Sequence, residues 1–388
     1  MPAPSPPCAV VVGLELNGLG VVRSLARAGA EVIALDTDLA RPTCATRHGR
    51  KVRVAGLAGA ALIEALLRLR ATLDRDPVLF LTQEAAVETV SAQRAALQGA
   101  YRFSMPDHDL MLTLLDKLRF QALAERLGFP IPRAVRLNAA NGTAGLEGLR
   151  FPCVLKPTTK HPDWARHFSK AYRLSDATEA EALWPAMRAV VDEVIVQEWI
   201  EGGDSDVYFC LQYRPPDGGR ATSFTGRKLR QWPPLVGGTA CCIPAPEAEA
   251  DLTDLTGRFF AAAGFVGIGS MEYKRDRRDG RFYMVEPTVG RTDYQEEVAT
   301  LNGVNIPWAA CLGETGQPPP VPAPAAAPAG WRDPEGDANA RAASPGAPEV
   351  TWNRWRDAYF RFDDPMPFVA LKLGHAAERL RRLRRADP

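Results

Sequence analysis

Apolar runs alternate with helical patterns along the first hundred residues. Residues 9–12 form an apolar run, a glycine-rich turn and a helical pattern at 20–28 follow, and a second apolar run at 31–35 ends at Asp36. Strand, helix and strand within about 30 residues predict a parallel sheet with a covering helix. The alternation continues with a helix, a strand and a helix, predicted at residues 58–73, 77–81 and 83–97. We therefore predict a Rossmann-like α/β domain over residues 9–108.

The pattern changes near residue 110 to shorter, mixed elements. A helical pattern runs from Leu110 to Leu127 and stops at Gly128. The later segments are predicted as four strands and one helix, namely strands at 151–157, 194–199, 207–213 and 221–228 and a helix at 177–191. Such a succession of strands favours largely antiparallel pairing. We therefore predict an α+β region that extends to about residue 316.

Proline is the compositional outlier of this chain. It occupies 33 of 388 positions, nearly twice the roughly 5% that is usual. Four prolines crowd the first seven residues, so residues 1–8 are predicted to be disordered, and nine lie in residues 317–350, where Pro, Ala and Gly fill 22 of 34 positions. This composition lacks the large apolar residues that a core needs, so we predict a semi-rigid linker over 317–350.

The remaining segment, residues 351–388, carries nine basic and five acidic residues and ends in a basic helical pattern. Its aromatic residues favour docking over disorder. We expect this tail to dock on its own domain or to stay a solvated helix. Contact with an anionic membrane or with a partner is the alternative that a basic amphipathic helix raises.

Net charge and cysteine content limit the partners and the cellular compartment that we expect for this protein. The chain has 47 basic and 46 acidic residues, a net charge of +1, so bulk charge indicates no nucleic-acid partner. Its seven cysteines include no CxxC pair, which is typical of a reduced compartment. The first residues do not resemble a signal peptide, and no run of 18 apolar residues would span a bilayer. We expect a cytoplasmic protein, with a homodimer as an open alternative to a monomer.

The first glycine turn, VVVGLELNGLG, lies between a predicted strand and helix, where dinucleotide-binding proteins bind a pyrophosphate. Asp36 lies at a suitable distance along the chain to hold a ribose. However, a fingerprint that starts at Gly13 places Glu15 where the second glycine should be, and a carboxylate there repels phosphate. We therefore prefer a tight structural turn, and we keep an NAD(P)-dependent oxidoreductase as an alternative function.

Two glutamates are predicted to face each other across a hairpin in residues 264–291. The turn is Asp279-Gly280, and Glu272 and Glu286 each lie seven residues from Asp279. A loop centred on Asp279 pairs them with Cβ atoms about 5 Å apart, whereas a strict two-residue turn does not, so the pairing requires an odd loop or a bulge. Because paired carboxylates repel, a cation such as Mg²⁺ that bridges substrate phosphates is the natural occupant.

Two lysines are candidates for binding phosphate. Lys156 ends the apolar run of PCVLKP, where a charged ammonium group is unfavourable unless it contacts an anion. Lys117 starts a helix directly after Asp116. Further along, VIVQEWIEGGDSD runs an apolar strand into an acidic turn. Such a segment can offer its backbone to an adenine edge and a carboxylate to a ribose.

The order of these motifs resembles the ATP-grasp superfamily of carboxylate–amine ligases. The motifs are Asp116-Lys117 with LAERLGFPIP, then FPCVLKP, VQEWIEGG, TGRKLRQWP with Gly237-Gly238, GSMEYKRD, and VEPTVGR with LNGVNIP. The resemblance covers roughly residues 8–316. It implies a Rossmann-like pre-ATP-grasp domain at 9–108 and a two-subdomain ATP-grasp fold at 109–195 and 196–316.

The resemblance also implies a reaction. ATP, with Mg²⁺ or alternatively Mn²⁺, would activate a small carboxylate as an acyl phosphate, and an amine would then displace phosphate. Both substrates would be small molecules, and ADP and phosphate would be released.

Site residues follow from the same resemblance, position by position. Lys117 and Lys156 would contact ATP phosphates, and Glu201 or Asp206 would hold the ribose. The adenine-binding hinge would be Glu198, Trp199 and Ile200. Glu272 and Glu286 would hold the metal. Lys228 and Arg291, with Arg230 as a further candidate, would neutralise the transferred phosphoryl group or bind the acceptor carboxylate.

Two departures from the family pattern bear on activity. Thr288 stands where the family usually has the asparagine of Glu-x-Asn-x-Arg, and Arg291 comes one residue late. A hydroxyl is a poorer metal ligand than an amide carbonyl. The glycine-rich phosphate lid is replaced by TTKHPDWARHFSK, whose cations are Lys160, Arg166 and Lys170. A non-catalytic protein that binds ATP is therefore a further alternative.

Overall fold

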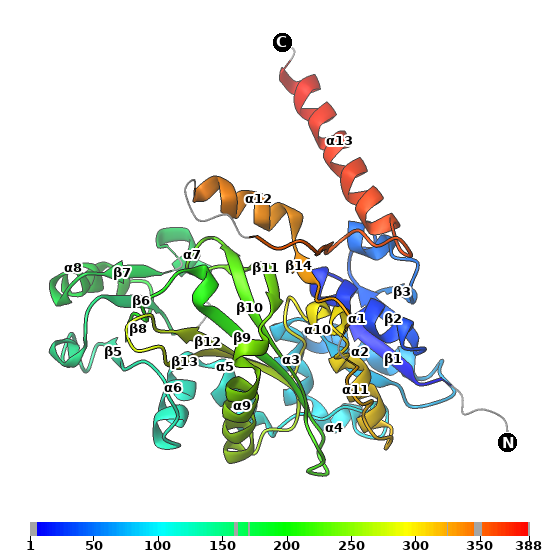
Figure 1. Ribbon diagram of the computed structural model, residues 1–388, viewed down its shortest axis with the longest axis horizontal. Coiled ribbons are helices and arrows are strands. Elements are labelled where there is room, and N and C mark those ends of the chain that lie inside the picture. The colour runs from blue at the N-terminus through cyan, green and yellow to red at the C-terminus, as the bar shows by residue number, and fades with distance from the viewer. Residues whose placement is uncertain (1–5, 159–161, 170, 324, 345–350, 387–388) are drawn as a thin grey trace.

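The N-terminal part of the computed structural model is a four-stranded parallel sheet, in the order β3-β2-β1-β4 (Figure 1). The structure describes residues 6–158, 162–169, 171–323, 325–344 and 351–386. The strands are β1 (Cys8–Val12), β2 (Glu31–Asp36), β3 (Arg50–Arg53) and β4 (Val78–Leu81). The helices that accompany them are α1 (Leu16–Arg27), α2 (Gly59–Arg70), α3 (Glu84–Ala92) and α4 (Arg94–Leu97). The predicted parallel α/β domain is confirmed.

Two short helices connect this sheet to the rest of the chain, α5 (His108–Leu115) and α6 (Lys117–Arg126). The helical pattern predicted from Leu110 to Leu127 is interrupted at Asp116, whereas the helix start predicted at Lys117 is confirmed. Asp116 has extended backbone angles, and its carboxylate accepts hydrogen bonds from the backbone N–H groups of Leu118 and Arg119. This is an N-cap, so Asp116 ends one helix and starts the next. The break places Lys117 at the first position of α6.

A small antiparallel sheet follows, in the order β5-β8-β6-β7. Its strands are β5 (Ala134–Asn138), β6 (Cys153–Pro157), β7 (Tyr172–Leu174) and β8 (Glu193–Glu198). The helices of this part are α7 (Pro162–His167) and α8 (Ala177–Met187). Its own core is built around Trp164, Trp184 and Met187. The predicted strand at 151–157 and the helix that begins at Ala177 are both present.

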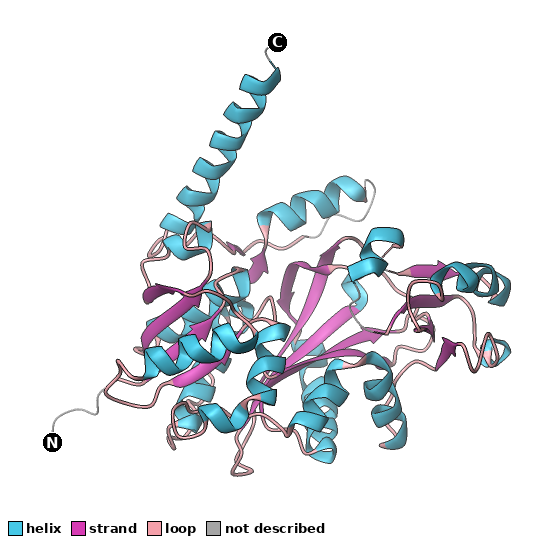
Figure 2. Cartoon of the chain, turned by 180° about the vertical axis from the view of Figure 1, so that it is seen from behind, coloured by secondary structure: helices cyan, strands magenta, loops and turns pink. Residues whose placement is uncertain are grey.

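A larger, seven-stranded sheet has the order β13-β12-β9-β10-β11-β14-β15 and forms the centre of the molecule. Its strands are β9 (Val207–Arg214), β10 (Thr222–Trp232), β11 (Gly238–Pro244), β12 (Gly267–Arg275), β13 (Phe282–Val289), β14 (Gly330–Arg332) and β15 (Trp355–Asp357). Its helices are α9 (Glu249–Ala263), α10 (Glu297–Leu301) and α11 (Ile306–Glu314). Figure 2 shows helices on both sides of this sheet.

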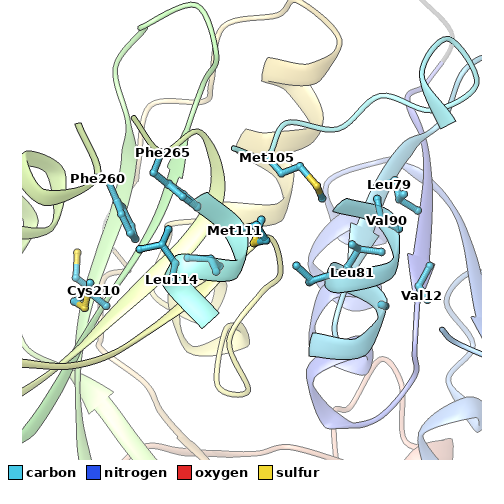
Figure 3. Close-up of a cluster of buried hydrophobic side chains, with 14 of the residues drawn as sticks. Val12, Leu79, Leu81, Val90, Met105, Met111, Leu114, Cys210, Phe260 and Phe265 are labelled. Carbon is cyan, nitrogen blue, oxygen red and sulfur yellow. The ribbon is translucent and has the colours of Figure 1, made fainter. Parts of the chain in front are cut away.

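Both faces of the large sheet are buried, so alternate residues of β9 enter different cores. Tyr208 and Cys210 join a cluster with α5 and α9, whereas Phe209 and Leu211 pack with α1 and α11. In the first cluster, Met111 and Leu114 of α5 lie between Leu81 of β4 and the aromatic rings of Phe260 and Phe265 (Figure 3). The N-terminal domain is thereby packed directly on the large sheet.

The predicted linker over residues 317–350 is wrong for its second half. Trp331, only 1% exposed, lies in β14, which pairs antiparallel with β11 and parallel with β15. A helix follows, α12 (Pro334–Ala343), whose Asp337 is buried against Arg230 of β10 at 2.5 Å. One tryptophan and two strand pairings suffice to order a segment whose average composition is poor in apolar residues. They also commit Arg230, one of the cations considered for phosphate binding, to a structural ion pair.

The tail docks on the N-terminal domain, as its aromatic residues predict. Arg23 of α1 donates from Nε to Asp364 at 2.8 Å and from its terminal nitrogens to the carbonyl oxygens of Ala358 and Tyr359. The side chains of Arg23 and Asp364 are both 0% exposed. The last helix, α13 (Met366–Ala386), then extends away from the body of the molecule (Figure 1).

The buried carboxyl of Glu296, directly before α10, should make the stability of the protein depend on pH. Burial, followed by the neighbouring charge of Glu297, raises the pKa of Glu296 from 4.5 to about 8. Between these two values the folded protein holds a proton that the unfolded chain releases. The free energy of unfolding should therefore fall as pH rises through this window, by up to about 1.4 kcal/mol per pH unit from this group, and level off above pH 8.

Urea unfolding between pH 5 and pH 9 measures this dependence in wild type, Glu296→Gln and Glu88→Gln. The glutamine keeps an oxygen that can accept from the Thr300 hydroxyl, as Glu296 does at 3.2 Å, but it has no proton to lose. The slope should disappear in Glu296→Gln and persist in Glu88→Gln, which alters an exposed glutamate of α3. An unchanged slope in Glu296→Gln would show that another group is responsible.

Candidate functional site

The hairpin of β12 and β13 brings the two predicted glutamates opposite each other. Glu272 pairs with Glu286, and the register shifts by one residue immediately afterwards, so that Tyr273 pairs with Met284. The shift leaves Val285 as the extra residue of a bulge. The predicted pairing is confirmed, including the irregularity that it requires. Because side chains alternate along a strand, Ser270 and Thr288, which also pair, lie on the same face as the two glutamates.

A buried lysine of β10 contacts one of these glutamates. Lys228 Nζ donates to Glu272 Oε2 and lies 3.3 Å from Gln231 Oε1. Burial alone would lower the pKa of Lys228, but the facing charges of Glu272, Asp293 and Glu286 outweigh it, and the pKa is raised. The pKa of Glu272 is also raised, by burial and by the repulsion of Glu286 and Asp293, which together exceed the effect of Lys228. The raised pKa of Lys228 reflects the carboxylates that face it, whereas that of Glu272 is due first to burial.

Lys117 lies at the opposite side of the glutamate pair. Its Nζ is 3.9 Å from Glu286 Oε1, so the chain of charges runs from Lys117 through Glu286 and Glu272 to Lys228. Two lysines and two glutamates that are far apart in sequence thus lie together in the structure. A third carboxylate, Asp293, was missed by the sequence analysis.

Asp293 is held firmly close to this group. Its Oδ2 accepts from Ser270 Oγ at 3.0 Å and from Gln295 Nε2 at 3.2 Å, and its Oδ1 accepts from the backbone N–H of Tyr294. Its charge acts on both Lys228 and Glu272. An acidic residue two positions after Arg291 was the available signal in the sequence.

Lys156 is oriented by a pair of buried amides. Its Nζ donates to Gln197 Oε1 at 3.1 Å, and Gln197 Nε2 donates in turn to Gln121 Oε1 at 2.9 Å. Gln197 and Gln121 are both buried. Lys156 and Gln197 lie on neighbouring strands β6 and β8, and Gln121 lies on α6, which also carries Lys117. The two amides were not predicted, because a lone glutamine in an apolar strand has no distinctive pattern.

The predicted hinge, residues 198–200, leaves the small sheet at the end of β8. Glu198 accepts from the Arg150 backbone N–H at 3.0 Å, and the Trp199 backbone N–H donates to the Pro152 carbonyl at 2.9 Å. The Trp199 ring faces the Lys274 ammonium at 4.3 Å, a cation–π contact. Burial lowers the pKa of Lys274 despite the acidic residues around it. Ile200 is buried, so the hinge is fixed by packing as well as by hydrogen bonds.

The two ribose candidates both have partners. Glu201 lies 3.4 Å from the Arg173 guanidinium, and Asp206 accepts from the backbone N–H of Gly203 and pairs with Arg277 at 2.6 Å. Asp204 was not singled out, yet it ties the hinge to β10. Its carboxylate accepts from the backbone N–H groups of Gln231 and Leu235, both at 2.8 Å.

Arg291 stands in a different environment from Lys228. It follows Gly290, which has a φ of 68°, and its Nη1 donates to the Thr292 carbonyl at 3.1 Å. It lines a small cavity of about 20 Å³ together with Tyr213 and Glu314. Among the described residues, no hydrogen bond or ion pair joins Arg291 to Lys228 or Glu272, and the role that the sequence predicts for the two cations stays a prediction. The expected lid cations Lys160 and Lys170 lie outside the described residues, and Arg166 pairs with Asp163 at 2.7 Å.

The N-terminal turn does not suit a dinucleotide. The Asp36 carboxylate accepts from the backbone N–H groups of Leu14 at 2.8 Å and Asp38 at 2.9 Å, and it is buried. A Cβ at Gly18 would lie 1.9 Å from the Gly13 carbonyl oxygen. The glycines therefore let helix and turn pack on each other, and the predicted ribose ligand is already used by the turn itself.

No family model matches the chain. Among curated proteins, it is 29% identical over 188 residues to a D-alanine–D-alanine ligase of Pseudomonas fluorescens (strain Pf0-1), a match that covers 46% of this chain and 55% of that enzyme. The D-alanine–D-alanine ligase of Pseudomonas putida (strain GB-1) is 28% identical over 188 residues, 46% of this chain and 56% of the enzyme. The chain thus spans about half the length of the curated relatives it matches.

Solved structures share the fold over most of the chain. An N5-carboxyaminoimidazole ribonucleotide synthetase in complex with ADP superposes with a TM-score of 0.62 at 15% identity, covering 83% of this chain and 80% of the other. A biotin carboxylase from Campylobacter jejuni gives a TM-score of 0.62 at 14% identity over 81% of this chain and 72% of the other. Within the described residues, no helix is long and apolar enough to cross a membrane. With its parallel N-terminal domain, its two further sheets and its similarity to D-alanine–D-alanine ligases, the chain belongs to the ATP-grasp superfamily.

Proposed function

We propose that this protein is an ATP-dependent ligase that activates a small carboxylate as an acyl phosphate and joins it to an amine. The observation that carries the proposal is the group of Lys117, Glu286, Glu272 and Lys228, in which two opposed carboxylates lie between two ammonium groups. Such a group suits the phosphates and the metal of a nucleotide. The superfamily and the similarity to D-alanine–D-alanine ligases support the same chemistry.

The donor set fits Mg²⁺. No group of three or more His, Cys, Asp or Glu side chains that could hold a metal occurs among the described residues. Mg²⁺ is commonly bound by only one or two carboxylates, with substrate phosphates and water completing its shell, so Glu272 and Glu286 suffice. Thr288 would add a hydroxyl on the same face. When bound, the ion would neutralise phosphate charge, and Mn²⁺ could replace it.

The remaining predicted residues are proposed to bind the nucleotide. Lys117 and Lys156 would contact phosphates, each ammonium being held in place by a polar neighbour. The hinge residues Glu198, Trp199 and Ile200 would present backbone groups to the adenine. Glu201 or Asp206 would accept hydrogen bonds from the ribose hydroxyls. Each would then give up its contact with an exposed arginine, Arg173 or Arg277.

The proposed reaction has two steps. A carboxylate oxygen of the substrate attacks the γ-phosphorus of ATP, the bond to the β–γ bridging oxygen breaks, and ADP leaves. An amine nitrogen then attacks the acyl carbon, phosphate leaves, and the nitrogen loses a proton to solvent. Lys228 would stabilise the phosphoryl charge through its buried ammonium. Arg291 would bind a substrate carboxylate at the edge of this site.

The test is an assay of ADP and phosphate release by the purified full-length chain with ATP and Mg²⁺. The panel should include amino acids, D-alanine among them, and other small carboxylates, each with and without a second amine. Hydroxylamine in place of the amine should trap an acyl phosphate as a hydroxamate. Saturable ATP binding without turnover across the panel would favour the non-catalytic alternative and contradict the ligase.

Thr288→Asn should strengthen metal binding, because an amide carbonyl is a better ligand than a hydroxyl at this position. We expect the Mg²⁺ concentration that gives half-maximal ADP release to fall several-fold, with little change at saturating Mg²⁺. Thr178→Asn, which alters an exposed threonine of α8, is the matched control and should not lower it. An unchanged Mg²⁺ requirement in Thr288→Asn would remove this residue from the metal site.

A further inference from the structure

Helix α13 is anchored at one end and exposed along the rest of its length. Near its start, Leu371 is buried, the Phe368 ring packs against Phe360 with centroids 5.6 Å apart, and His375 contacts Glu335 of α12 at 2.7 Å. After His375, every described side chain of the helix is exposed. At 1.5 Å per residue, 21 residues span about 30 Å. Figures 1 and 2 both show the helix standing clear of the body.

An apolar stripe runs along this exposed helix. Met366, Val369 and Leu373 are 48%, 39% and 65% exposed and follow one another at spacings of three and four residues. In the sequence, the same alternation continues at Ala376, Leu380 and Leu383. Directly before the helix, Phe362 is 92% exposed. An exposed apolar stripe of this length favours contact with another surface.

Basic residues accompany the stripe. Residues 366–386 contain six arginines and lysines against the single acid Glu378. By helical spacing, Lys372 and Arg379 occupy positions on one side of the stripe and Arg384 a position on the other, while Arg381, Arg382 and Arg385 follow on the more distant face. Apolar residues flanked by cations are typical of helices that lie in the headgroup region of anionic membranes.

A second copy of the same helix fits this surface poorly. In a parallel pair joined along the stripe, the position of Arg379 in one helix would approach that of Arg384 in the other. This contact brings like charges together without a compensating acid. The surface of an anionic membrane suits both the stripe and the basic residues, because its acyl chains can bury apolar side chains and its headgroups carry negative charge.

We propose that α13 binds the protein to the surface of anionic membranes. The helix lies along the headgroup region with its apolar stripe inward and its arginines at the lipid phosphates. It does not span the bilayer, because it is not apolar enough to do so. The docked segment before it, fixed by Arg23 and Asp364, holds the enzyme body against that surface.

Flotation of the full-length chain with lipid vesicles tests this. Vesicles of phosphatidylcholine mixed equally with phosphatidylglycerol should carry the protein, and pure phosphatidylcholine vesicles should not. Binding should weaken steeply with added salt. Arg379→Glu combined with Arg381→Glu should lower the partition coefficient at least about fivefold for each charge reversed. Leu373→Asp should lower it about tenfold or more.

Matched controls alter exposed residues elsewhere in the chain. Val321→Asp replaces an exposed valine and Arg220→Glu an exposed arginine, and neither should change vesicle binding. Equal recovery on neutral and anionic vesicles, or binding that the α13 variants leave intact, would overturn the proposal. A concentration-dependent dimer that Leu373→Asp dissociates, without vesicle binding, would assign the stripe to self-association instead. ADP release is not measured, so the outcome is independent of the proposed function.

Discussion

Glu286→Gln should lower the kcat for ADP release by about a hundredfold or more, equivalent to about 2.7 kcal/mol of lost transition-state stabilisation. The amide cannot supply the negative charge that a metal ion held by Glu272 and Glu286 would require. Glu286 is 60% exposed and lies 3.9 Å from Lys117, so the change should leave the free energy of unfolding nearly unaltered. Steady-state kinetics at saturating ATP and varied Mg²⁺ measure the effect.

Glu272→Gln should lower kcat at least as strongly, with an additional loss of stability. Its carboxylate contacts the buried Lys228 ammonium, which would lose its charged partner. Comparing the two variants distinguishes an effect on catalysis from an effect on stability, because only Glu272→Gln should reduce both kcat and the free energy of unfolding. Glu181→Gln, an exposed glutamate of α8, is the control for both measurements. Near wild-type kcat in folded Glu286→Gln would contradict the metal assignment.

Asp364→Asn should reduce the free energy of unfolding by about 3–5 kcal/mol, because it breaks a fully buried ion pair and leaves the Arg23 charge uncompensated. The same carboxylate accepts from the Thr46 hydroxyl and from the Arg47 backbone N–H. Burial alone would raise the pKa of Asp364, but these hydrogen bonds and Arg23 outweigh it and lower the pKa. Its contribution is therefore present above pH 3.8 and is lost as pH falls further.

The neighbouring residue provides the control. Asp363 is 52% exposed and pairs with Arg27 at 2.8 Å, so Asp363→Asn should lower stability by less than about 1 kcal/mol. Urea unfolding of both variants gives the comparison. The double variant Arg23→Met plus Asp364→Leu should recover part of the loss, since it removes both charges together. Equal effects of the two aspartate variants would show that the tail contributes little to the stability of the fold.

The local sequence pattern predicted a structural feature correctly where all the residues that define the feature lie in one segment of the chain. The alternation of apolar runs and helical stretches predicted the parallel sheet, because a parallel strand is buried on both faces. The Asp279-Gly280 turn and the spacing of Glu272 and Glu286 predicted their pairing, since register follows from the turn and the count of residues. The order of the motifs indicated the superfamily to which the chain belongs.

Other features depended on contacts between distant segments. Lys228 of β10 meets Glu272 of β12 across the intervening strand β9, and Lys156 meets Gln197, which in turn meets Gln121 of α6; no local spacing defines these contacts. Asp293 lies after the end of β13 and comes near the glutamate pair through its hydrogen bond from Ser270 of β12. Trp331 orders a segment whose average composition predicts a linker, because a single large side chain finds a buried site on the central sheet.

The sequence by itself therefore determined the architecture and the chemical character of the site, both of which rest on periodicity and on short spacings. Tertiary structure decided which cations face which carboxylates and that Asp36 and Arg230 are committed to structural contacts. It also decided that the tail is fixed to α1 through Arg23 while its basic helix stands free. The physical reason is that hydrogen bonds and ion pairs join residues by position in space, which only the packed sheets and helices define.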